Sequence, residues 1–152
     1  MLSKKCKYAI HALVYLAERY QQGPVHIQEI AERQHIPKKF LEAILLEFKS
    51  AGILHSRPGR GGGYTLNRAP RTVTLGRVIR LLDGPLAPIP CVSQTAYAPC
   101  RDCPDESACA IRAVMKEVRD ATAKVLDETT LADLLDKKSR LAGASTALDF
   151  HI

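Results

Sequence analysis

Four of the chain's five cysteines lie within nineteen residues, in the stretch CVSQTAYAPCRDCPDESAC that runs from Cys91 to Cys109. Their spacing is C-x8-C-x2-C-x5-C, which places Cys100 and Cys103 between the outer pair. Cysteine thiolates bind zinc, hold iron–sulfur clusters and can be oxidised to disulfides. The spacing therefore predicts a metal centre, an iron–sulfur cluster or a redox-active thiol group in this segment.

The spacing alone does not choose between these kinds of site. A zinc ribbon has two separated C-x2-C pairs, whereas this stretch contains only the pair Cys100 and Cys103. A thioredoxin-like pair begins a helix after a strand, but five prolines from Pro85 to Pro104 predict an irregular loop. Four free cysteines without a role are not expected in a loop, because free cysteine is usually buried. A cluster, a zinc site and a thiol switch therefore all stay open.

The charge of the chain is distributed unevenly. Residues 1–84 carry 14 Lys and Arg against 6 Asp and Glu, whereas residues 85–152 carry 8 against 10. A basic half joined to a slightly acidic half is typical of a protein whose first half meets nucleic acid, although basic side chains also solvate helix faces. A chain of 152 residues forms one domain, or one domain with an appendage.

The sequence also bears on location and on catalysis. No segment reaches the roughly 18 apolar residues of a membrane span, and His11 interrupts the apolar run near the N-terminus, which is therefore not expected to be a signal peptide. We expect a cytoplasmic protein without a membrane partner, in which thiols stay reduced. No nucleophile–base constellation is visible, so we expect a protein that is not an enzyme; a small thiol oxidoreductase is the alternative.

Apolar periodicity predicts three helices in the first third of the chain. They cover about residues 3–20, 27–34 and 37–50. Pro37 suits the start of the third helix and Gly52 its end, whereas His26 is a poor N-cap for the second helix. Two short helices joined by the tight turn HIP form a helix-turn-helix pattern, which binds DNA through its second helix.

A strand, a turn and a second strand follow, with the sequences ILHS, RPGRGGG and YTLNR. A hairpin directly after a helix-turn-helix is interpreted as a wing. Gly61 and Gly62 allow the backbone to approach a neighbour closely, and Tyr64 lies at the start of the second strand. Arg57 and Arg60 place two guanidinium groups on this thin loop, and the minor groove of DNA attracts such groups.

Three more helices are expected after the wing. One begins at Thr74 and ends near Leu82, a long one runs from about Ser107 to Glu128, and a short one follows Thr130. The long helix repeats apolar residues at intervals of three and four, as a coiled coil does. These seam residues are Ile111, Val114, Val118, Ala121 and Val125. Such a seam suits a homodimer, and the two-fold symmetry of a dimer matches a palindromic DNA site.

The expected elements divide the chain into four parts. Residues 1–84 are expected to form a winged helix-turn-helix domain, and residues 85–106 a sensing loop rich in proline and cysteine. Residues 107–138 are expected to form the dimerisation helix and a short final helix, followed by a flexible tail at 139–152. The predicted fold class is mainly α, with a small β-hairpin wing and a long C-terminal dimerisation helix.

The segment IPKKFLEAILLEFKSAGILHSRPGRGGGYTLNRAPRTVTLGRVIRLLDG resembles the winged helix-turn-helix of the IscR/NsrR/CymR family of regulators. Its most specific motifs are FLEAILLEFKSAGIL, the GRGGGY wing and the helix that ends in LLDG, and the resemblance continues to TTLADLL. It implies a homodimeric bacterial transcription factor whose long helix forms the dimer interface. In several branches of this family, cysteines in the loop before that helix bind an iron–sulfur cluster, whereas other branches use a different signal.

Four residues of the third helix lie off its apolar stripe and near its N-terminal end, where they would enter the major groove. These residues are Lys38, Lys39, Glu42 and Ala43. The lysines can reach phosphates or guanine acceptors, and Glu42 can accept a hydrogen bond from a cytosine amino group. An ion pair between Glu42 and Lys38, four residues before it, is the alternative. The expected partner is double-stranded DNA, and a dimer module without DNA binding is the competing interpretation.

The resemblance makes an iron–sulfur cluster the favoured cofactor. A [2Fe–2S] cluster is preferred, and a [4Fe–4S] cluster is the alternative. The family commonly places five residues between neighbouring loop cysteines, as Cys103 and Cys109 do here. Cys91 takes the first position at a longer distance, and Cys100 is additional. We expect the cluster to lie near the DNA-binding half and to change DNA binding when it is lost. A redox-responsive regulator that uses thiols or zinc without a cluster is the alternative.

A site with three cysteines would need a fourth ligand. The family recruits such ligands from the first helix or from the helix-turn-helix, among other places. In this chain the resemblance makes Cys6 and His35 the candidates, unless Cys100 completes the site.

Overall fold

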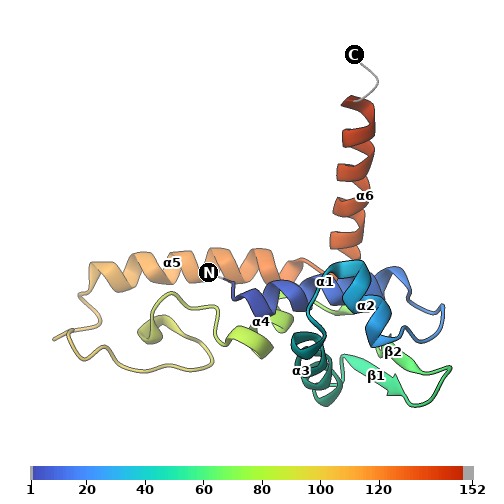
Figure 1. Cartoon of the computed structure of the whole chain (residues 1–152). Coiled ribbons are helices and arrows are strands. Elements are labelled where there is room, and N and C mark those ends of the chain that lie inside the picture. Colours follow the sequence, from blue (N-terminus) through green and yellow to red (C-terminus); the bar gives the residue numbers. More distant parts are fainter. Residues whose placement is uncertain (1, 149–152) are drawn as a thin grey trace.

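The structure is a computed structural model, and it describes residues 2–148 (Figure 1). Its helices and strands follow the expected order. They are α1 (Lys4–Glu18), α2 (Ile27–Gln34), α3 (Lys38–Ser50), β1 (Leu54–Arg57), β2 (Gly63–Leu66), α4 (Leu75–Asp83), α5 (Ala110–Glu128) and α6 (Leu131–Leu148), with short 3-10 turns η1 (Pro70–Thr72) and η2 (Pro90–Val92). The predicted mainly α fold with a β-hairpin is confirmed.

Helix α1 lies at the centre of the hydrophobic core and contacts α2, α3, α4 and α6. Its alanines Ala9 and Ala12 are fully buried, and small side chains at a helix surface let neighbouring helices approach closely. The remaining core is built from Leu13 and Leu16 of α1 together with apolar residues of α3, such as Phe48. This core positions the helix-turn-helix and the wing on one rigid body.

The helix-turn-helix consists of α2 and α3. Helix α2 ends at His35, which adopts a left-handed backbone conformation with φ of 53° and donates its backbone N–H to the carbonyl of Ala31. Pro37 then precedes α3, which begins one residue later than expected. Helix α3 buries Leu41, Ile44, Leu45 and Phe48, so its opposite face is left to solvent.

The wing is the antiparallel hairpin of β1 and β2, in which Leu54 pairs with Leu66 and Arg57 pairs with Gly63. Val25, just before α2, extends this hairpin by a β-bridge to Tyr64. The two backbone hydrogen bonds of the bridge measure 3.0 Å and 2.9 Å. Because an isolated two-stranded hairpin is only marginally stable in water, this bridge ties the wing to the helical core.

Helix α5 has 19 residues and is therefore about 28 Å long. Its N-cap is Cys109, so it starts three residues later than the expected position. Asp105 accepts hydrogen bonds from the backbone N–H and the hydroxyl of Ser107, and such an Asx turn holds the chain out of the helical conformation. The helix therefore begins only after this turn.

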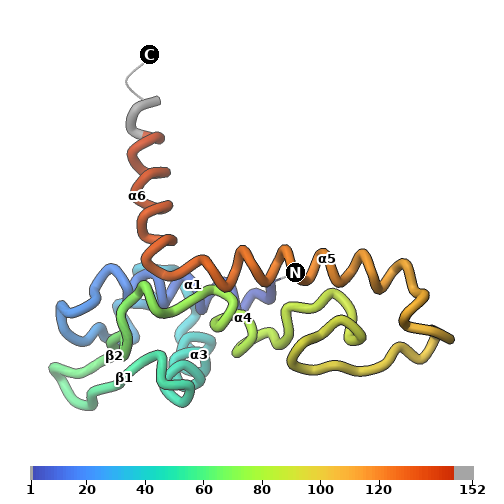
Figure 2. The backbone as a smooth tube through the Cα atoms, turned by 180° about the vertical axis from the view of Figure 1, so that it is seen from behind, coloured from blue at the N-terminus to red at the C-terminus, as the bar shows by residue number. Residues whose placement is uncertain are grey.

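The loop between α4 and α5 runs back along α5, so the cysteine-bearing segment lies at the end of α5 that is remote from the wing (Figures 1 and 2). The expectation that this loop lies near the DNA-binding half of its own chain is therefore wrong. The reason is the length of α5, which separates its N-terminal end from α1–α4 by several turns. Helix α5 itself is what connects the two regions.

Helix α6 begins with the predicted cap, because Thr130 and Asp133 bond each other through their side chains and backbone N–H groups. Leu131 is fully buried in the core of the winged domain, so α6 belongs to that domain at its start. The helix then projects away from the body (Figure 2) and continues through Leu148.

The expected flexible tail at 139–152 is therefore wrong over residues 139–148. The segment is rich in Ala and Leu, which favour helix, and it contains no proline. Residues 149–152 lie outside the described part of the chain. Among the helices of residues 2–148, none is both long and apolar enough to cross a membrane.

Candidate cysteine site and DNA-binding surface

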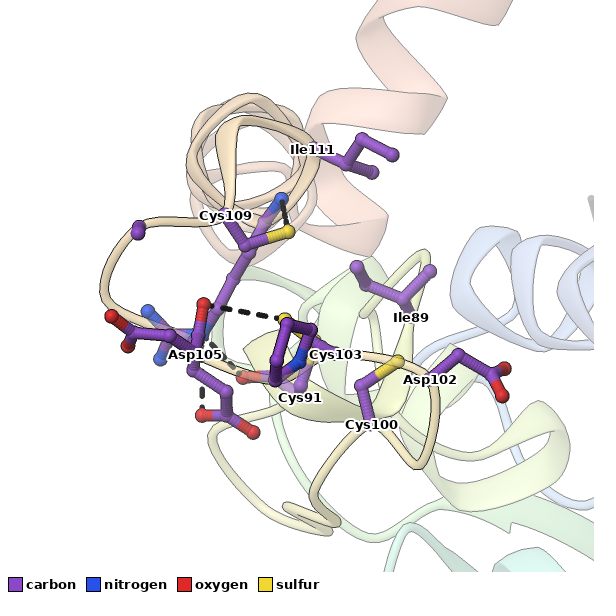
Figure 3. A pocket seen from close by; sticks show the side chains of 12 residues that line it. Ile89, Cys91, Cys100, Asp102, Cys103, Asp105, Cys109 and Ile111 are labelled. Atoms are coloured by element: carbon purple, nitrogen blue, oxygen red, sulfur yellow. Dashed lines mark hydrogen bonds and ion pairs between the residues drawn. The ribbon is translucent and has the colours of Figure 1, made fainter.

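The four loop cysteines line one cavity of about 430 Å³ at the N-terminal end of α5 (Figure 3). Ile89, Pro104 and Ile111 supply apolar walls, whereas Glu106 and Arg112 supply charged groups. The cavity is thus formed by the loop on one side and by the first turn of α5 on the other. The structure brings together the four residues that the sequence singled out.

The four cysteines differ in exposure. Cys91 lies on η2 and is only 5% exposed, whereas Cys100 is exposed, and Cys103 and Cys109 are half-buried. The loop residues from 94 to 102 are exposed. Cys91 and Cys109 are therefore held by ordered elements, whereas Cys100 lies on the solvent side of the cavity.

Cys109 caps α5 with its own sulfur atom. The backbone N–H of Arg112 donates to Cys109 Sγ across 3.4 Å, and this hydrogen bond lowers the pKa of the Cys109 thiol. A helix N-terminus carries a partial positive charge, which favours an anion at the cap. The thiolate form, which binds metals and reacts with oxidants, is therefore favoured at Cys109.

Cys103 lies next to Cys109, and each thiol influences the pKa of the other. Partial burial and the Cys109 thiol raise the pKa of Cys103, while its sulfur donates to the carbonyl oxygen of Asp105 at 3.3 Å. One thiol of this pair therefore ionises more readily than the other. A pair of this kind suits both metal binding and oxidation.

Two arginines of α5 fix the short turn that carries Cys91. Arg112 Nε donates to the carbonyl oxygen of Cys91 at 3.3 Å, and an Arg119 guanidinium N–H donates to the carbonyl oxygen of Val92 at 2.5 Å. Arg112 also pairs with Glu106 at 3.6 Å. The backbone beside Cys91 is therefore attached directly to α5. These arginines lie seven residues apart on one helix face, but the sequence alone did not show that this face meets η2.

The donor set fits an iron–sulfur cluster, because thiolates are its ordinary ligands and the four cysteines share one partly apolar cavity beside a cationic arginine. Within residues 2–148, no group of three or more His, Cys, Asp or Glu side chains is arranged to hold a metal ion. Neither a zinc site nor a cluster site is thus preformed in the described part of the chain. Ligation by all four cysteines requires the exposed part of the loop to draw inward.

The proposed additional ligands lie elsewhere in the chain. Cys6 is fully buried on α1, and desolvation together with nearby Asp83 raises the pKa of its thiol to about 11. His35 is exposed at the turn between α2 and α3. Neither residue lines the cysteine cavity, so the structure does not bring Cys6 or His35 to this site within one chain.

The residues expected to enter the major groove share the exposed face of α3. They are Lys38, Lys39, Glu42 and Ala43. In the described part of the chain, no ion pair joins Glu42 to Lys38, so this carboxylate is available to an incoming partner. The structure therefore leaves the predicted recognition surface uncovered.

The predicted wing residues fall into two groups. Arg57 is exposed at the end of β1, and Arg60 and Gly61 are exposed in the turn that follows. Gly62 is buried, and it lies so close to the Arg57 backbone that a Cβ there would overlap the carbonyl oxygen of Arg57. Tyr64 is half-buried against the core. Arg57, Arg60 and Gly61 are thus placed for contact, whereas Gly62 and Tyr64 support the wing from within.

The apolar seam of α5 is uncovered in the single chain. Ile111, Val114, Val118 and Val125 are 68%, 52%, 45% and 62% exposed, and Ala121 is exposed as well. Exposed contiguous apolar surface on a helix marks an interaction site. The seam therefore remains available to a second copy.

Comparison with known proteins gives a consistent result. The family model Rrf2, described as an iron-dependent transcriptional regulator, matches residues 2–137. An rrf2-like HTH-type transcriptional regulator of Rhodobacter capsulatus is 46% identical over 89% of this chain and 92% of its own. The HTH-type transcriptional regulator CymR of Bacillus subtilis is 32% identical over 99% of both chains.

Solved structures show the same relationship. CymR, the global cysteine regulator of B. subtilis, superposes with a TM-score of 0.75 at 30% identity, over 90% of this chain and 97% of its own. IscR of T. potens superposes with a TM-score of 0.71, also at 30% identity. The superposition covers 91% of this chain and 88% of the IscR chain. These matches confirm the resemblance noted in the sequence, and the relatives are regulators rather than enzymes. The chain therefore belongs to the Rrf2 family of winged helix-turn-helix, DNA-binding transcriptional regulators.

Proposed function

We propose that this regulator is a cytoplasmic homodimer whose DNA binding is controlled by an iron–sulfur cluster held in the cysteine cavity. The observation that carries the proposal is the convergence of Cys91, Cys100, Cys103 and Cys109 on one cavity at the start of α5. That helix carries the uncovered apolar seam. The proposed sensing site and the proposed dimer surface are thus parts of one element.

Cys91, Cys103 and Cys109 are the proposed ligands, with Cys100 as the fourth. A cluster of the [2Fe–2S] type is favoured, and [4Fe–4S] is the alternative. When bound, the cluster supplies a group that responds to oxidants, nitric oxide or iron supply. The guanidinium of Arg112 beside the cavity favours the negative charge of a thiolate-bound cluster.

The cap of α5 supplies the first step of the proposed response. Cys109 Sγ accepts the backbone N–H of Arg112, while the Arg112 side chain bonds the carbonyl of Cys91 and pairs with Glu106. A change in the ligation or oxidation of Cys109 therefore alters the cap, and with it the first turn of α5. Helix caps typically contribute about 1 kcal/mol, which is enough to shift a balanced two-state equilibrium.

The far end of α5 is attached to the winged domain. Arg80 of α4 forms a bidentate ion pair with Asp127 of α5, with N–O distances of 2.5 Å and 2.8 Å. The backbone N–H of Leu75 donates to the carbonyl of Thr129 at 2.9 Å. A displacement of α5 is thereby transmitted to α4, and α4 packs on α1 in the core of the DNA-binding half.

DNA is proposed to meet the exposed face of α3 and the tip of the wing. Lys38, Lys39, Glu42 and Ala43 would enter the major groove. Arg57 and Arg60 would contact the adjacent minor groove or its phosphates. With two copies related by a two-fold axis, the expected operator is a palindrome.

Iron and sulfide content test the cofactor. We expect protein purified without oxygen to be coloured and to contain iron and acid-labile sulfide in equal amounts. The variants Cys103→Ser and Cys109→Ser should lose both, whereas Cys6→Ala should retain both because Cys6 lies outside the cavity. A colourless wild-type protein without iron, or one with stoichiometric zinc, would contradict the proposal. Cys100→Ser decides whether Cys100 is a ligand, since only a ligand is needed for full occupancy.

A thiol switch without a cluster is the second candidate. It is favoured by the proximity of Cys103 and Cys109, whose thiols influence each other's pKa. A peroxide would accept two electrons and two protons from the two thiols, which leaves a disulfide and, from hydrogen peroxide, two molecules of water. Peptide mapping after mild oxidation distinguishes the candidates: a Cys103–Cys109 disulfide in iron-free protein with altered DNA binding supports the switch.

A further inference from the structure

His26 occupies the N-cap of α2, a position at which Ser, Thr, Asp or Asn usually lies. Its side chain does not cap the helix. Instead, Nε2 of its ring lies 2.8 Å from the carbonyl oxygen of Arg60 at the wing tip. Because a carbonyl oxygen only accepts hydrogen bonds, this ring nitrogen must carry the proton and donate. The poor cap noted in the sequence thus has a second partner that the sequence did not reveal.

The part of β2 next to the wing tip is fixed by other contacts. Val25 and Tyr64 exchange two backbone hydrogen bonds. Gly63 packs directly against Val25, and a Cβ at Gly63 would overlap the Val25 carbonyl oxygen. The residue that precedes His26 therefore clamps β2 where the strand begins, directly after the turn of the hairpin.

The tip of the wing, residues 58–61, is exposed. Within residues 2–148, the hydrogen bond from His26 is the only one that joins this tip to a part of the chain outside the hairpin. Two of the four tip residues are glycines, which lower the barrier to other backbone conformations. Among the described residues, His26 therefore supplies the one direct hydrogen bond that fixes the tip itself, beside the β2 residues that Val25 holds.

We propose that His26 is a positioning residue for DNA binding, which holds the Arg60 backbone so that the wing arginines keep a fixed orientation relative to α3. The inference rests on the proposed role of the wing in DNA binding. A loop that is ordered before binding does not lose that conformational entropy on binding. His26 thus acts on affinity through Arg60, without touching DNA itself.

The substitution His26→Thr separates this role from a general effect on folding. Threonine at the N-cap can accept the backbone N–H of Glu29, which the His26 side chain leaves uncapped. The variant should therefore melt at a temperature no lower than the wild type. Its affinity for DNA should fall by roughly threefold to tenfold, the equivalent of one hydrogen bond.

The probe is a DNA duplex that the wild-type protein selects from random sequences, with affinity measured by fluorescence anisotropy. His26→Gln keeps an N–H donor of similar reach and should bind within about twofold of the wild type. His11→Thr removes an exposed imidazole from α1 and serves as the matched control. In the His26→Thr background, Arg60→Ala should cost less affinity than it does in the wild type, because the two residues act through one contact.

The outcomes distinguish this inference from the function on which it rests. If Arg57→Ala and Arg60→Ala bind as the wild type does, the wing has no part in binding and both proposals fall. If the arginine variants bind weakly but His26→Thr binds normally, only the positioning role is overturned. A parallel loss of affinity and melting temperature in His26→Thr, or a failure of His26→Gln to restore affinity, also overturns it.

Discussion

The sulfur of Cys109 has two roles in one place, since it caps α5 and lines the cavity of the four cysteines. The sequence identified Cys109 as a ligand candidate but not as a helix cap, because the start of α5 was expected earlier. At the residue scale, this double role is the reason that chemistry at the cavity can change a helix. Cysteine is an uncommon cap, and its sulfur can leave the cap when it binds a metal or is oxidised.

Cys6, by contrast, is expected to be an unreactive thiol. Its thiol is fully buried and its pKa is raised to about 11, so at pH 8 only about one molecule in a thousand carries the thiolate. In folded protein from which iron has been removed, we expect iodoacetamide to label Cys100 rapidly and to leave Cys6 unlabelled, as measured by peptide mass spectrometry. Labelling in urea is the control, in which both should react. Equal native labelling of Cys6 and Cys100 would show that the placement of Cys6 in the core is wrong.

Arg57 offers a prediction for the wing. Replacing it with alanine should weaken DNA binding and reduce the slope of log affinity against log salt by about 1, because one phosphate neutralisation is lost. Arg140 is exposed on α6, which projects away from the body, so Arg140→Ala changes the net charge equally without changing the wing. Titrations at several salt concentrations provide the comparison. Identical slopes for the two variants would show that Arg57 does not contact DNA.

At the scale of elements, the helix-turn-helix, the wing and the long helix could all be predicted from periodicity and turn residues. The errors lie at α5 and α6. An Asx turn at Asp105 delays the start of α5, and α6 extends past Lys138 because Ala and Leu continue its helical preference. The direction of the cysteine loop could not be predicted, since it depends on contacts of Arg112 and Arg119 with backbone carbonyls far away in the sequence.

The ion pair of Arg80 and Asp127 joins α4 to α5 and gives a prediction at this scale. Asp127→Ala should lower the free energy of unfolding at pH 7 by about 0.5–1 kcal/mol, since the pair is only partly buried. Asp120→Ala is the control, because Asp120 pairs only with its neighbour Arg119 within α5. Urea unfolding of the three proteins measures the difference.

The same pair predicts a dependence on pH. Arg80 lowers the pKa of Asp127. The contribution of the ion pair to the free energy of unfolding is therefore present above the ordinary carboxyl pKa, and it is lost as the pH falls through the lowered pKa. The difference between wild type and Asp127→Ala should therefore shrink between pH 7 and pH 3. A difference that stays constant over this range would show that the ion pair does not stabilise the contact of α4 with α5.

At the scale of the whole molecule, the apolar seam of α5 is exposed along its length in the single chain, and we propose that a second copy covers it. Val118→Glu should convert a dimer into a monomer, since it places a charge in the proposed interface. Lys116→Glu introduces the same residue at an exposed position outside the seam and should leave the dimer intact. Sedimentation velocity gives the mass of each species. A monomeric wild type would contradict the proposed dimer, and a dimeric Val118→Glu variant would place the contact elsewhere.

If the state of the cysteine cavity controls DNA binding, the affinity for DNA must change when the proposed cluster is removed. The affinity of anaerobically purified protein for its selected duplex is measured before and after the removal of iron, with Cys109→Ser protein as the cluster-free reference. We expect the removal of iron to change the affinity by at least about tenfold, and the treated wild type then to match Cys109→Ser. Equal affinities for the iron-bound and iron-free protein would contradict it.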